Sequence, residues 1–169
     1  MPGVRLLSEQ LDINWHQDSE RGASHLTRET RKDVLFVCTG NTCRSVLAEY
    51  IGRRFCGEAF AFESAGIQPQ PPSDSENAVY TLRNTFDIDA SGHQPRDVRA
   101  IDLAKFALVV AFENNVATVV RGLGVPESRV QVWAVQDPWG GNLAEYDQAA
   151  LEIRRKLSEF CKSGRNHEA

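Results

Sequence analysis

The sequence predicts an α/β fold in which four parallel strands form a sheet with helices on both faces, a three-layer sandwich. From Asp33 onward, apolar runs without a polar break alternate with stretches whose apolar residues recur every three or four positions. Runs of the first kind are typical of strands buried on both faces. Their alternation with helices is typical of a parallel sheet. A chain of 169 residues is long enough for one such domain.

Strands are expected where apolar residues run together, and helices where apolar residues recur on one face. Ser73 or Asp74 is the expected cap of the second helix, which ends at Phe86. Gly124 is the expected end of the helix at 113–123. The predicted strands are 33–38, 60–64, 106–111 and 129–135, and the other predicted helices are 45–56, 100–105 and 143–162.

The chain divides into three segments by composition. Residues 33–163 carry the alternating pattern and are the predicted domain, and residues 164–169 are a short C-terminal tail. Residues 1–32 are polar, with only a short apolar cluster that includes Leu11 and Trp15. We expect this N-terminal extension to be flexible. The alternatives are a linker left from a fused domain and an arm that packs Trp15 on a neighbouring surface.

The segment from Val34 to Ser45 indicates the chemistry of the chain. An apolar strand ends at Cys38, five residues follow, and Arg44 and Ser45 then begin a helix. A loop of this length at a helix N-terminus can direct its backbone amides at the oxygens of a phosphate group. The planar guanidinium of Arg44 adds a bidentate contact. Because the same positive field favours the thiolate of Cys38, the motif predicts phosphoryl transfer through a phosphocysteine.

Composition argues against several classes of partner and site. A net charge of −4 gives no support to nucleic-acid binding, and no apolar run approaches the ~18 residues of a membrane span. The N-terminus lacks the apolar core of a signal peptide. The four histidines lie far apart, so we expect no metal and no cofactor. The four cysteines do not form a secreted framework, which favours the cytoplasm, with Cys56 and Cys161 as buried helix residues.

Four motifs together resemble the low-molecular-weight protein tyrosine phosphatase family. They are Val37-Cys38-Thr39-Gly40-Asn41-Thr42-Cys43-Arg44-Ser45, Ser64-Ala65-Gly66, Gly92-His93-Gln94-Pro95-Arg96 and Asp137-Pro138, in the family's order. The resemblance implies a flavodoxin-like fold and a cysteine-dependent protein phosphatase. One departure is Val46, where the family usually has proline. Since proline at a first helical turn is only a preference, we expect little loss.

These motifs suggest a role for each residue of the site. Cys38 attacks phosphorus, Arg44 holds the equatorial oxygens, and Asp137 protonates the leaving atom and then accepts a proton from water. Ser45 donates a hydrogen bond to the sulfur. The resemblance suggests that Cys43 can form a reversible disulfide with Cys38 under oxidation. The predicted phosphate-binding loop is Thr39, Gly40, Asn41, Thr42, Cys43 and Ser45, and the resemblance implies that Asn41, Ser64 and His93 hold its shape.

The predicted substrate is a phosphorylated protein, with phosphotyrosine and phosphoarginine both open. Family members that act on phosphotyrosine commonly have a bulky aliphatic residue at the position of Thr42. Threonine there, and Trp139-Gly140-Gly141 after Asp137-Pro138, resemble the bacterial branch that acts on protein arginine. Trp139 can stack on an aryl ring or on a guanidinium. The alternative is that threonine at position 42 is simply a tolerated small residue and does not determine the substrate. The oligomeric state stays open.

Two other classes of protein remain as alternatives. A thiol-dependent arsenate reductase shares the fold and the loop. Such enzymes relay electrons through a further cysteine pair downstream, whereas this chain has no cysteine between Cys56 and Cys161. A non-catalytic phosphate-binding module could dispense with the nucleophile or the acid, yet Cys38, Arg44 and Asp137 are all present.

Overall fold

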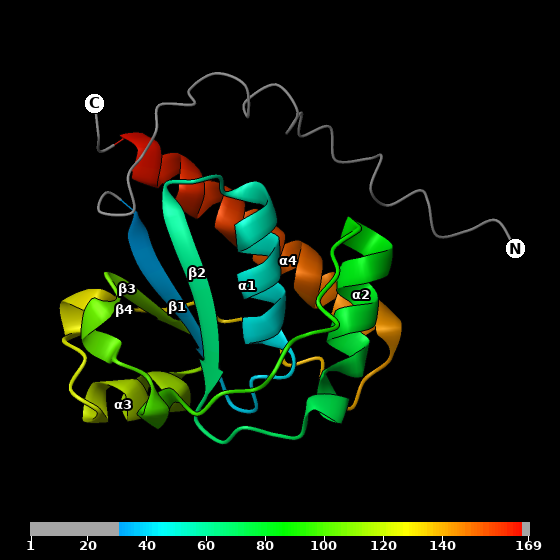
Figure 1. Cartoon of the computed structure of the whole chain (residues 1–169), viewed down its shortest axis with the longest axis horizontal. Helices are drawn as coiled ribbons and strands as arrows, with labels where there is room; N and C mark the ends of the chain where they lie inside the picture. The colour runs from blue at the N-terminus through cyan, green and yellow to red at the C-terminus, as the bar shows by residue number, and fades with distance from the viewer. Residues whose placement is uncertain (1–30, 167–169) are drawn as a thin grey trace, which may run out of the picture.

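The computed structural model of the protein describes residues 31–166. The predictions made for residues 1–30 and for residues 167–169 therefore lie outside the described residues. Within the described part, strands and helices alternate in the order expected from the sequence, as the colour gradient of Figure 1 shows.

Four parallel strands form the central sheet. They are β1 (Lys32–Cys38), β2 (Phe60–Gly66), β3 (Leu108–Ala111) and β4 (Val130–Val132), in the spatial order β2-β1-β3-β4. Phe36 of β1 lies opposite Ser64 of β2 and Val110 of β3. The chain moves to one side of β1 to form β2 and to the other side to form β3. Sheets of this kind bind ligands beyond the carboxyl ends of the strands where the order reverses, here β1 and β3.

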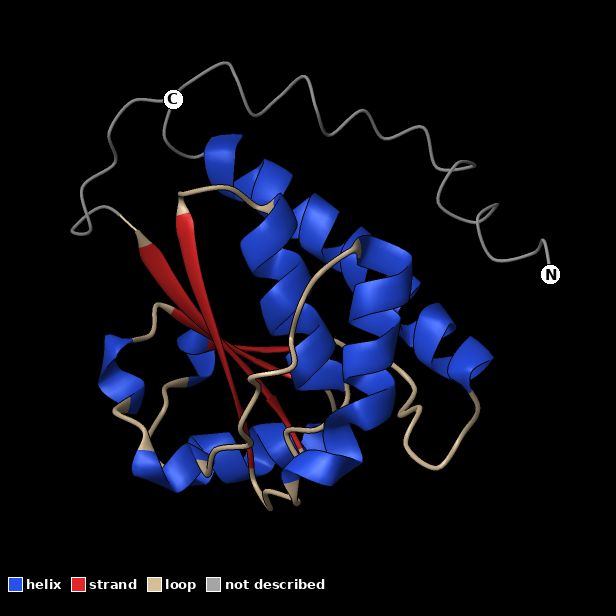
Figure 2. Ribbon diagram, turned by 45° about the vertical axis from the view of Figure 1, so that its right-hand side comes forward, coloured by secondary structure: helices blue, strands red, loops and turns tan. Residues whose placement is uncertain are grey.

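Helices cover both faces of the sheet, as Figures 1 and 2 show. α1 (Arg44–Phe55), α2 (Glu76–Phe86) and α4 (Leu143–Asn166) pack on the face that carries Phe36. α3 (Asn114–Gly122) packs on the opposite face, which carries Val37. Successive side chains of β1 point to opposite faces and are buried on both, which explains its unbroken apolar run. The prediction of a three-layer α/β fold with a four-stranded parallel sheet is confirmed.

Several elements have other bounds than the sequence predicted. β2 continues to Gly66 and not 64, and β3 begins at Leu108 and not 106. The largest differences are at the ends of β4 and α4. β4 ends at Val132 and not at 135, because β3 ends at Ala111 and offers no later partner. The last backbone bond between them runs from the amide of Trp133 to the carbonyl of Ala111. α4 continues to Asn166, beyond the end expected at 162. None of the helices in residues 31–166 is both long and apolar enough to cross a membrane.

Short 3-10 turns replace two predicted helical segments. Pro72–Ser75 forms a 3-10 turn, so α2 begins only at Glu76 and neither Ser73 nor Asp74 caps it. The helix expected at 100–105 is a pair of 3-10 turns. Each begins with an aspartate side chain that accepts a hydrogen bond from the amide two residues later, and the turns are Val98–Ala100 and Leu103–Lys105.

A disulfide between Cys56 and Cys161 joins the end of α1 to α4. Cys161 is buried in its helix as expected, whereas Cys56 lies just beyond α1 and is half-buried, so its placement inside a helix was wrong. The sequence did not indicate the bond, because 105 positions separate the two cysteines. Only the packing of α1 beside α4 brings their Cα atoms to 5.8 Å. Cys38 and Cys43 are free thiols.

We expect loss of this disulfide to destabilise the fold. A cross-link that closes a loop of about 100 residues restricts the unfolded chain, and its removal typically lowers the free energy of unfolding by about 2–5 kcal/mol. Urea unfolding of Cys161→Ser, beside oxidised and reduced wild type, measures the difference. The reduced wild type should match the variant, and reductant should not move the variant's midpoint. An oxidised wild type no more stable than the variant would contradict this expectation.

Candidate active site

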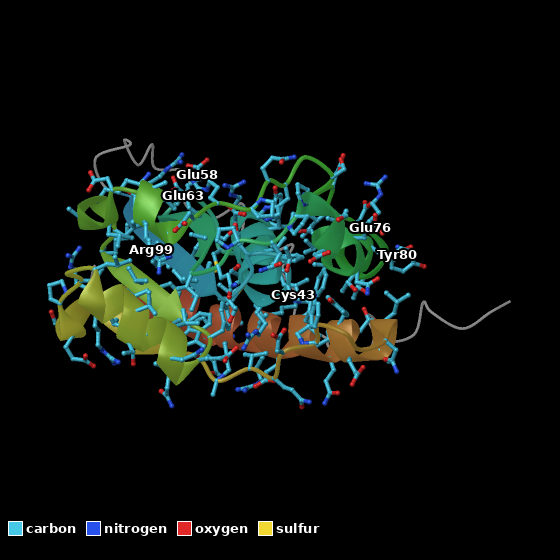
Figure 3. The ribbon with its side chains drawn as sticks, turned by 90° about the horizontal axis from the view of Figure 1, so that it is seen from below. Cys43, Glu58, Glu63, Glu76, Tyr80 and Arg99 are labelled. Atoms are coloured by element: carbon cyan, nitrogen blue, oxygen red, sulfur yellow. A yellow bond between two sulfur atoms is a disulfide. The ribbon has the colours of Figure 1, made fainter. Side chains whose placement is uncertain are left out.

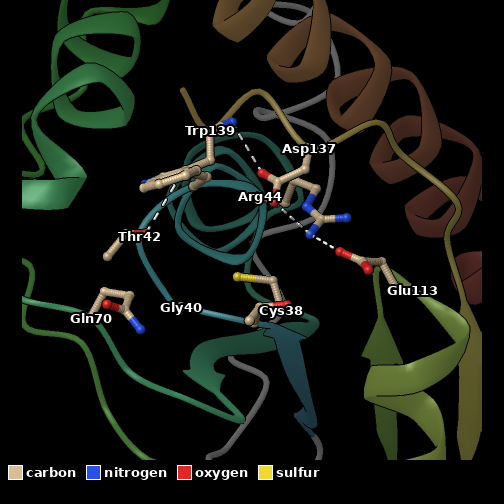
Figure 4. Close-up of a pocket in the computed structure, with 10 residues that line it drawn as sticks. Cys38, Gly40, Thr42, Arg44, Gln70, Glu113, Asp137 and Trp139 are labelled. Carbon is tan, nitrogen blue, oxygen red and sulfur yellow. Dashed lines mark hydrogen bonds and ion pairs between the residues drawn. The ribbon is translucent and has the colours of Figure 1, made fainter. Parts of the chain in front are cut away.

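The carboxyl ends of neighbouring strands meet around one cavity (Figure 4). Cys38 is the last residue of β1, Glu113 follows β3, and Asp137 lies between β4 and α4. Parallel strands bring their carboxyl ends to the same edge of a sheet, which is why residues distant in sequence converge here. The cavity has a volume of about 390 Å³ and is lined by Cys38, Thr39, Gly40, Thr42, Cys43, Arg44, Gln70, Glu113, Asp137 and Trp139.

The loop between β1 and α1 turns its carbonyl groups outward. The amides of residues 67, 68 and 70 donate to the carbonyls of Cys38, Thr39 and Gly40 at 3.1, 2.8 and 3.0 Å. Within residues 31–166, no backbone carbonyl accepts a hydrogen bond from the amides of residues 39–43. These amides are therefore available to an anion at the N-terminus of α1.

Gly66 allows the end of β2 to approach this loop closely. A Cβ atom at this position would lie 2.7 Å from the Thr39 carbonyl oxygen and 2.9 Å from the Asn41 amide nitrogen. Backbone atoms cannot yield as a flexible side chain can, so a larger residue would displace the loop. The glycine of Ser64-Ala65-Gly66 thus has a steric reason to be there.

Asn41 holds the loop through both polar atoms of its side chain. Its φ of 55° lies in the left-handed region, which non-glycine residues adopt only with support. Nδ2 donates to Ser45 Oγ and Ser64 Oγ, both at 2.9 Å, and Oδ1 accepts from the Arg96 amide at 2.9 Å. His93 Nε2 lies 2.9 Å from the Asn41 carbonyl oxygen. The structure thus brings together the three residues expected to support the loop, and adds Arg96.

Glu49 extends this network and was missed in the sequence. Its buried carboxylate accepts a hydrogen bond from Ser64 Oγ at 3.0 Å and pairs with Arg53 at 2.8 Å. Burial raises the pKa of the Glu49 carboxyl, and the Arg53 guanidinium opposes this shift. His93 Nδ1 lies 3.8 Å from the same carboxylate. One signal was available: Glu49 lies four residues after Ser45, on the same face of the helix.

Cys38 lies almost fully buried at the base of the cavity, with its side chain directed inward (Figure 4). Its Sγ is 2.9 Å from Ser45 Oγ. The Ser45 hydroxyl already accepts a hydrogen bond from Asn41 Nδ2 and can therefore point its own hydrogen at the sulfur. This arrangement suits a serine that stabilises a thiolate.

The Arg44 guanidinium is held by groups from two neighbouring strand ends. Nη1 donates to the carbonyl oxygens of Val135 at 3.1 Å and Phe112 at 3.4 Å. Nη2 pairs with the carboxylates of Glu113 and Asp137, the latter at 3.2 Å. Arg44 is only 2% exposed, and its buried Nε has no hydrogen-bond partner within the described residues. Because a buried N–H group without a partner costs free energy, Nε is ready to donate to an anion.

Asp137 and Trp139 lie at the mouth of the cavity. Asp137 Oδ1 accepts a hydrogen bond from the Trp139 amide at 3.2 Å, while Oδ2 faces Arg44. The Trp139 side chain is 63% exposed and lies across the cavity from Cys38 (Figure 4). A group that enters past Trp139 therefore meets the Asp137 carboxyl before it reaches Cys38.

Cys43 lies behind the loop, against α4. Its Sγ is 3.2 Å from Tyr146 Oη and 3.8 Å from Thr42 Oγ1. Burial raises the pKa of the Cys43 thiol to about 11, although the hydrogen bond with Tyr146 opposes the shift. Burial and the contact with Cys43 also raise the pKa of Tyr146. Cys43 is therefore a protonated thiol at neutral pH, and nothing in the sequence pattern pointed to Tyr146 as its partner.

Two residues that line the cavity, Glu113 and Gln70, were also missed by the sequence analysis. Glu113 lies two residues after the end of β3 at Ala111, and Cys38 is the last residue of β1, so position near a strand end was the available signal for Glu113. Within residues 31–166, no group of three or more His, Cys, Asp or Glu side chains is placed to hold a metal ion. Figure 3 shows the side chains with the molecule seen from below, with Cys43 near the centre of the view and Arg99 and Glu76 to either side.

Comparison with known proteins gives two sequence matches of note. The family model described as low molecular weight phosphotyrosine protein phosphatase matches residues 33–168. An arsenate reductase of Bacillus cereus (strain 03BB102) is 31% identical over 137 residues, which is 80% of this chain and 98% of that protein.

Solved structures share the fold along the same region. A low molecular weight protein tyrosine phosphatase from T. tengcongensis has a TM-score of 0.70 at 28% identity, over 78% of this chain and 99% of that chain. A mutant YwlE arginine phosphatase with a phosphorylated active-site serine has a TM-score of 0.68 at 25% identity, over 78% and 94%.

Proposed function

Because the chain belongs to the low molecular weight phosphotyrosine protein phosphatase family, we propose that it hydrolyses phosphorylated protein side chains through a phosphocysteine at Cys38. One observation carries the proposal. A free thiol, the available amides of residues 39–43 and the unpartnered Nε of Arg44 converge on one cavity. Such donors can hold the equatorial oxygens of a phosphoryl group while a nucleophile attacks from below. Residues 33–163 form the proposed catalytic domain.

The proposed reaction has two steps. The Cys38 thiolate forms a bond to phosphorus as the bond to the leaving atom breaks, and Asp137 gives that atom a proton. Water then attacks the phosphocysteine, Asp137 takes the proton of this water, and the thiolate leaves with the electron pair of the S–P bond. The phosphorylated active-site serine of the YwlE arginine phosphatase mutant supports a covalent phosphoenzyme.

Hydrolysis of p-nitrophenyl phosphate tests the proposal directly. A non-catalytic module with the same loop would bind inorganic phosphate without turnover. A wild-type protein that binds phosphate but releases no p-nitrophenol would overturn the proposed activity.

The proposed substrates carry phosphate on a flat side chain, either phosphotyrosine or phosphoarginine. The exposed ring of Trp139 at the cavity mouth offers a stacking face for an aryl group or a guanidinium. Thr42 lines the cavity beneath it and is nearly buried, so its size and hydroxyl bear on the group attached to phosphorus. The YwlE arginine phosphatase among the structural relatives favours phosphoarginine as the second candidate.

We expect Thr42→Ile to shift preference from phosphoarginine toward phosphotyrosine. Isoleucine fills more of the cavity and removes the hydroxyl, while the backbone amides of the loop stay in place. Changes of this kind in a pocket typically alter discrimination by ~1–3 kcal/mol, which is about tenfold to a few hundredfold in the ratio of kcat/KM values. The ratio is measured on matched phosphotyrosine and phosphoarginine peptides.

A matched control is Thr118→Ile, since Thr118 is exposed on α3, does not line the cavity and donates its hydroxyl hydrogen to the Asn114 carbonyl. That variant should keep the wild-type ratio. If Thr42→Ile kept the wild-type ratio of kcat/KM values, or if the wild type had no activity on phosphoarginine, phosphoarginine would be excluded as a substrate. Phosphotyrosine would then be the proposed substrate.

The relatives described as arsenate reductases make arsenate reduction the second candidate function. A thiol relay requires further sulfurs that reach Cys38 in turn, and Cys43 alone is near. Cys56 lies beyond the far end of the 12-residue α1, about 18 Å from the loop at 1.5 Å per residue. It is also bonded to Cys161. Formation of arsenite from arsenate with a thiol reductant, at a rate above that of phosphate ester hydrolysis, would favour the reductase.

We also propose reversible oxidation of the Cys38 and Cys43 pair, in a cytoplasmic protein. Both are free thiols that line the same cavity. Peroxide converts the Cys38 thiolate to a sulfenic acid, and the Cys43 thiol then displaces water to form a disulfide that a thiol reductant opens. Full recovery of Cys43→Ser after peroxide would contradict this protective role. The Cys56–Cys161 disulfide is a separate matter. In a reducing compartment we expect a part of the molecules to carry these two cysteines as free thiols. Alkylation of intact cells followed by mass spectrometry measures that fraction.

A further inference from the structure

Most donors of the Arg44 guanidinium have partners within the described residues. A guanidinium has five N–H groups. Both hydrogens of Nη1 donate to the backbone carbonyls of Phe112 and Val135. Nη2 donates to Glu113, and a carboxylate oxygen of Asp137 lies 3.2 Å from Nη2, at ion-pair distance but without a hydrogen bond. Nε has no hydrogen-bond partner within the described residues.

This engagement conflicts with a bidentate grip on phosphate. Such a grip uses Nε together with one N–H of a terminal nitrogen. The Nη1 hydrogens are tied to the backbone, so the second donor must come from Nη2. A phosphate oxygen on Nη2 would therefore take the place of one of the two carboxylates. Either could turn to solvent, since the side chains are 38% exposed for Glu113 and 43% for Asp137, but only Glu113 is hydrogen-bonded to Nη2.

The two carboxylates differ in how firmly the backbone that carries them is held. Glu113 directly precedes α3, where its carbonyl accepts a bond from the Ala117 amide at 3.1 Å, and its side chain caps nothing on that helix. Asp137 lies in the segment between β4 and α4 that has no regular structure, beside Trp139 on the side from which a substrate enters. Figure 4 shows Glu113 and Trp139 on opposite sides of Arg44.

We propose that Glu113 is a positioning residue that keeps hold of Arg44 throughout the reaction, so that Asp137 is the carboxylate displaced by phosphate. This inference rests on the proposed phosphatase function. A carboxylate beside a guanidinium stays ionised, whereas one beside a phosphate dianion favours its protonated form. Displaced from Arg44, Asp137 takes up a proton from solvent and becomes the acid that the leaving atom needs. Glu113 thus links the binding of phosphate to the protonation of Asp137, which then acts as the general acid.

The consequence of losing Glu113 follows from the donor count. In Glu113→Ala, one Nη2 hydrogen becomes free for phosphate, and Asp137 keeps its ion pair with Arg44. The variant should still bind phosphate but should lack a protonated Asp137. It should lose about tenfold or more in kcat/KM on phenyl phosphate, a poor leaving group, and much less on p-nitrophenyl phosphate, where acid help matters least.

Three comparisons separate this role from a structural one. Glu113→Gln retains an amide oxygen that accepts from Nη2 and should recover most of the loss on phenyl phosphate. In the Asp137→Ala background, Glu113→Ala should leave the ratio of the two substrates unchanged, because its effect passes through Asp137. The matched control is Glu127→Ala, since Glu127 is exposed and pairs with Arg121, away from the residues that line the cavity.

The outcomes distinguish this inference from the proposed function. A wild type inactive on both esters would overturn both. With an active wild type, the same substrate ratio in Glu113→Ala as in wild type would overturn the role of Glu113 alone. The role of Glu113 would also be overturned if Glu113→Ala lost kcat/KM equally on both esters and no longer bound inorganic phosphate. The same holds if Glu113→Gln were no more active on phenyl phosphate than Glu113→Ala.

Discussion

Cys38→Ser should abolish turnover and retain oxyanion binding. A serine hydroxyl at this position is a far weaker nucleophile than a thiolate, and loss of a covalent nucleophile typically costs about 10⁴-fold or more in kcat. The amides of residues 39–43 and the Nε of Arg44 do not depend on the sulfur, so they remain available to the anion. Inorganic phosphate should therefore still raise the melting temperature, as any ligand of the folded state does.

The measurement pairs a rate with a thermal shift on the same variant. Arg44→Lys is the contrasting variant, because an ammonium lacks the planar fork and should weaken the phosphate-induced shift while the thiol remains. More than a trace of p-nitrophenyl phosphate hydrolysis by Cys38→Ser would rule out the phosphocysteine. Loss of the thermal shift with an otherwise unchanged melting temperature would mean that the loop amides do not bind the anion.

Asp137→Ala should slow hydrolysis most for substrates with poor leaving groups. General acid catalysis typically contributes ~10²–10⁴-fold, and it matters most where the leaving atom would otherwise depart as a strong base. A loss of that size is expected on phenyl phosphate or on a phosphoarginine peptide, with a smaller loss on p-nitrophenyl phosphate. The ratio of kcat/KM values between the esters is the quantity to measure.

Two other carboxylates nearby in sequence serve as controls. Glu145 accepts a hydrogen bond from the Asn142 amide at the start of α4, and Asp147 accepts one from Thr85 of α2. Neither lines the cavity. Asp147→Ala should therefore keep the wild-type ratio. Equal losses on good and poor leaving groups in Asp137→Ala would place the acid elsewhere.

The family and the order of the elements were predictable because both depend on local sequence. The resemblance carried by the Cys38 loop, Ser64-Ala65-Gly66, Gly92–Arg96 and Asp137-Pro138 is confirmed by the family match over residues 33–168. Strand and helix patterns report which faces of an element are buried, and that was enough for the three-layer fold. Boundaries failed where a neighbour decided them, as in β4, which ends where β3 no longer offers a partner.

The candidate site divides in the same way. Cys38, Arg44 and Ser45 belong to one short segment, so their spacing alone predicted an anion-binding loop with a nucleophile at its base. The partners that hold this segment in place come from elsewhere in the chain: Ser64 and Arg96 on Asn41, and Tyr146 on Cys43. No periodicity reports such pairings, because each depends on which elements become neighbours.

By itself, the sequence determined the alternation of strands and helices and the phosphate-binding segment, since both follow from residues close together in the chain. The tertiary structure alone decided which carboxylates face Arg44 and which cysteines pair. Glu113 reaches Arg44 because β3 lies beside β1 in the sheet. Cys56 meets Cys161 because α1 and α4 cover the same face. The physical reason is that burial patterns fix the face on which a side chain lies, whereas contacts between distant residues depend on the order in which the strands and helices pack.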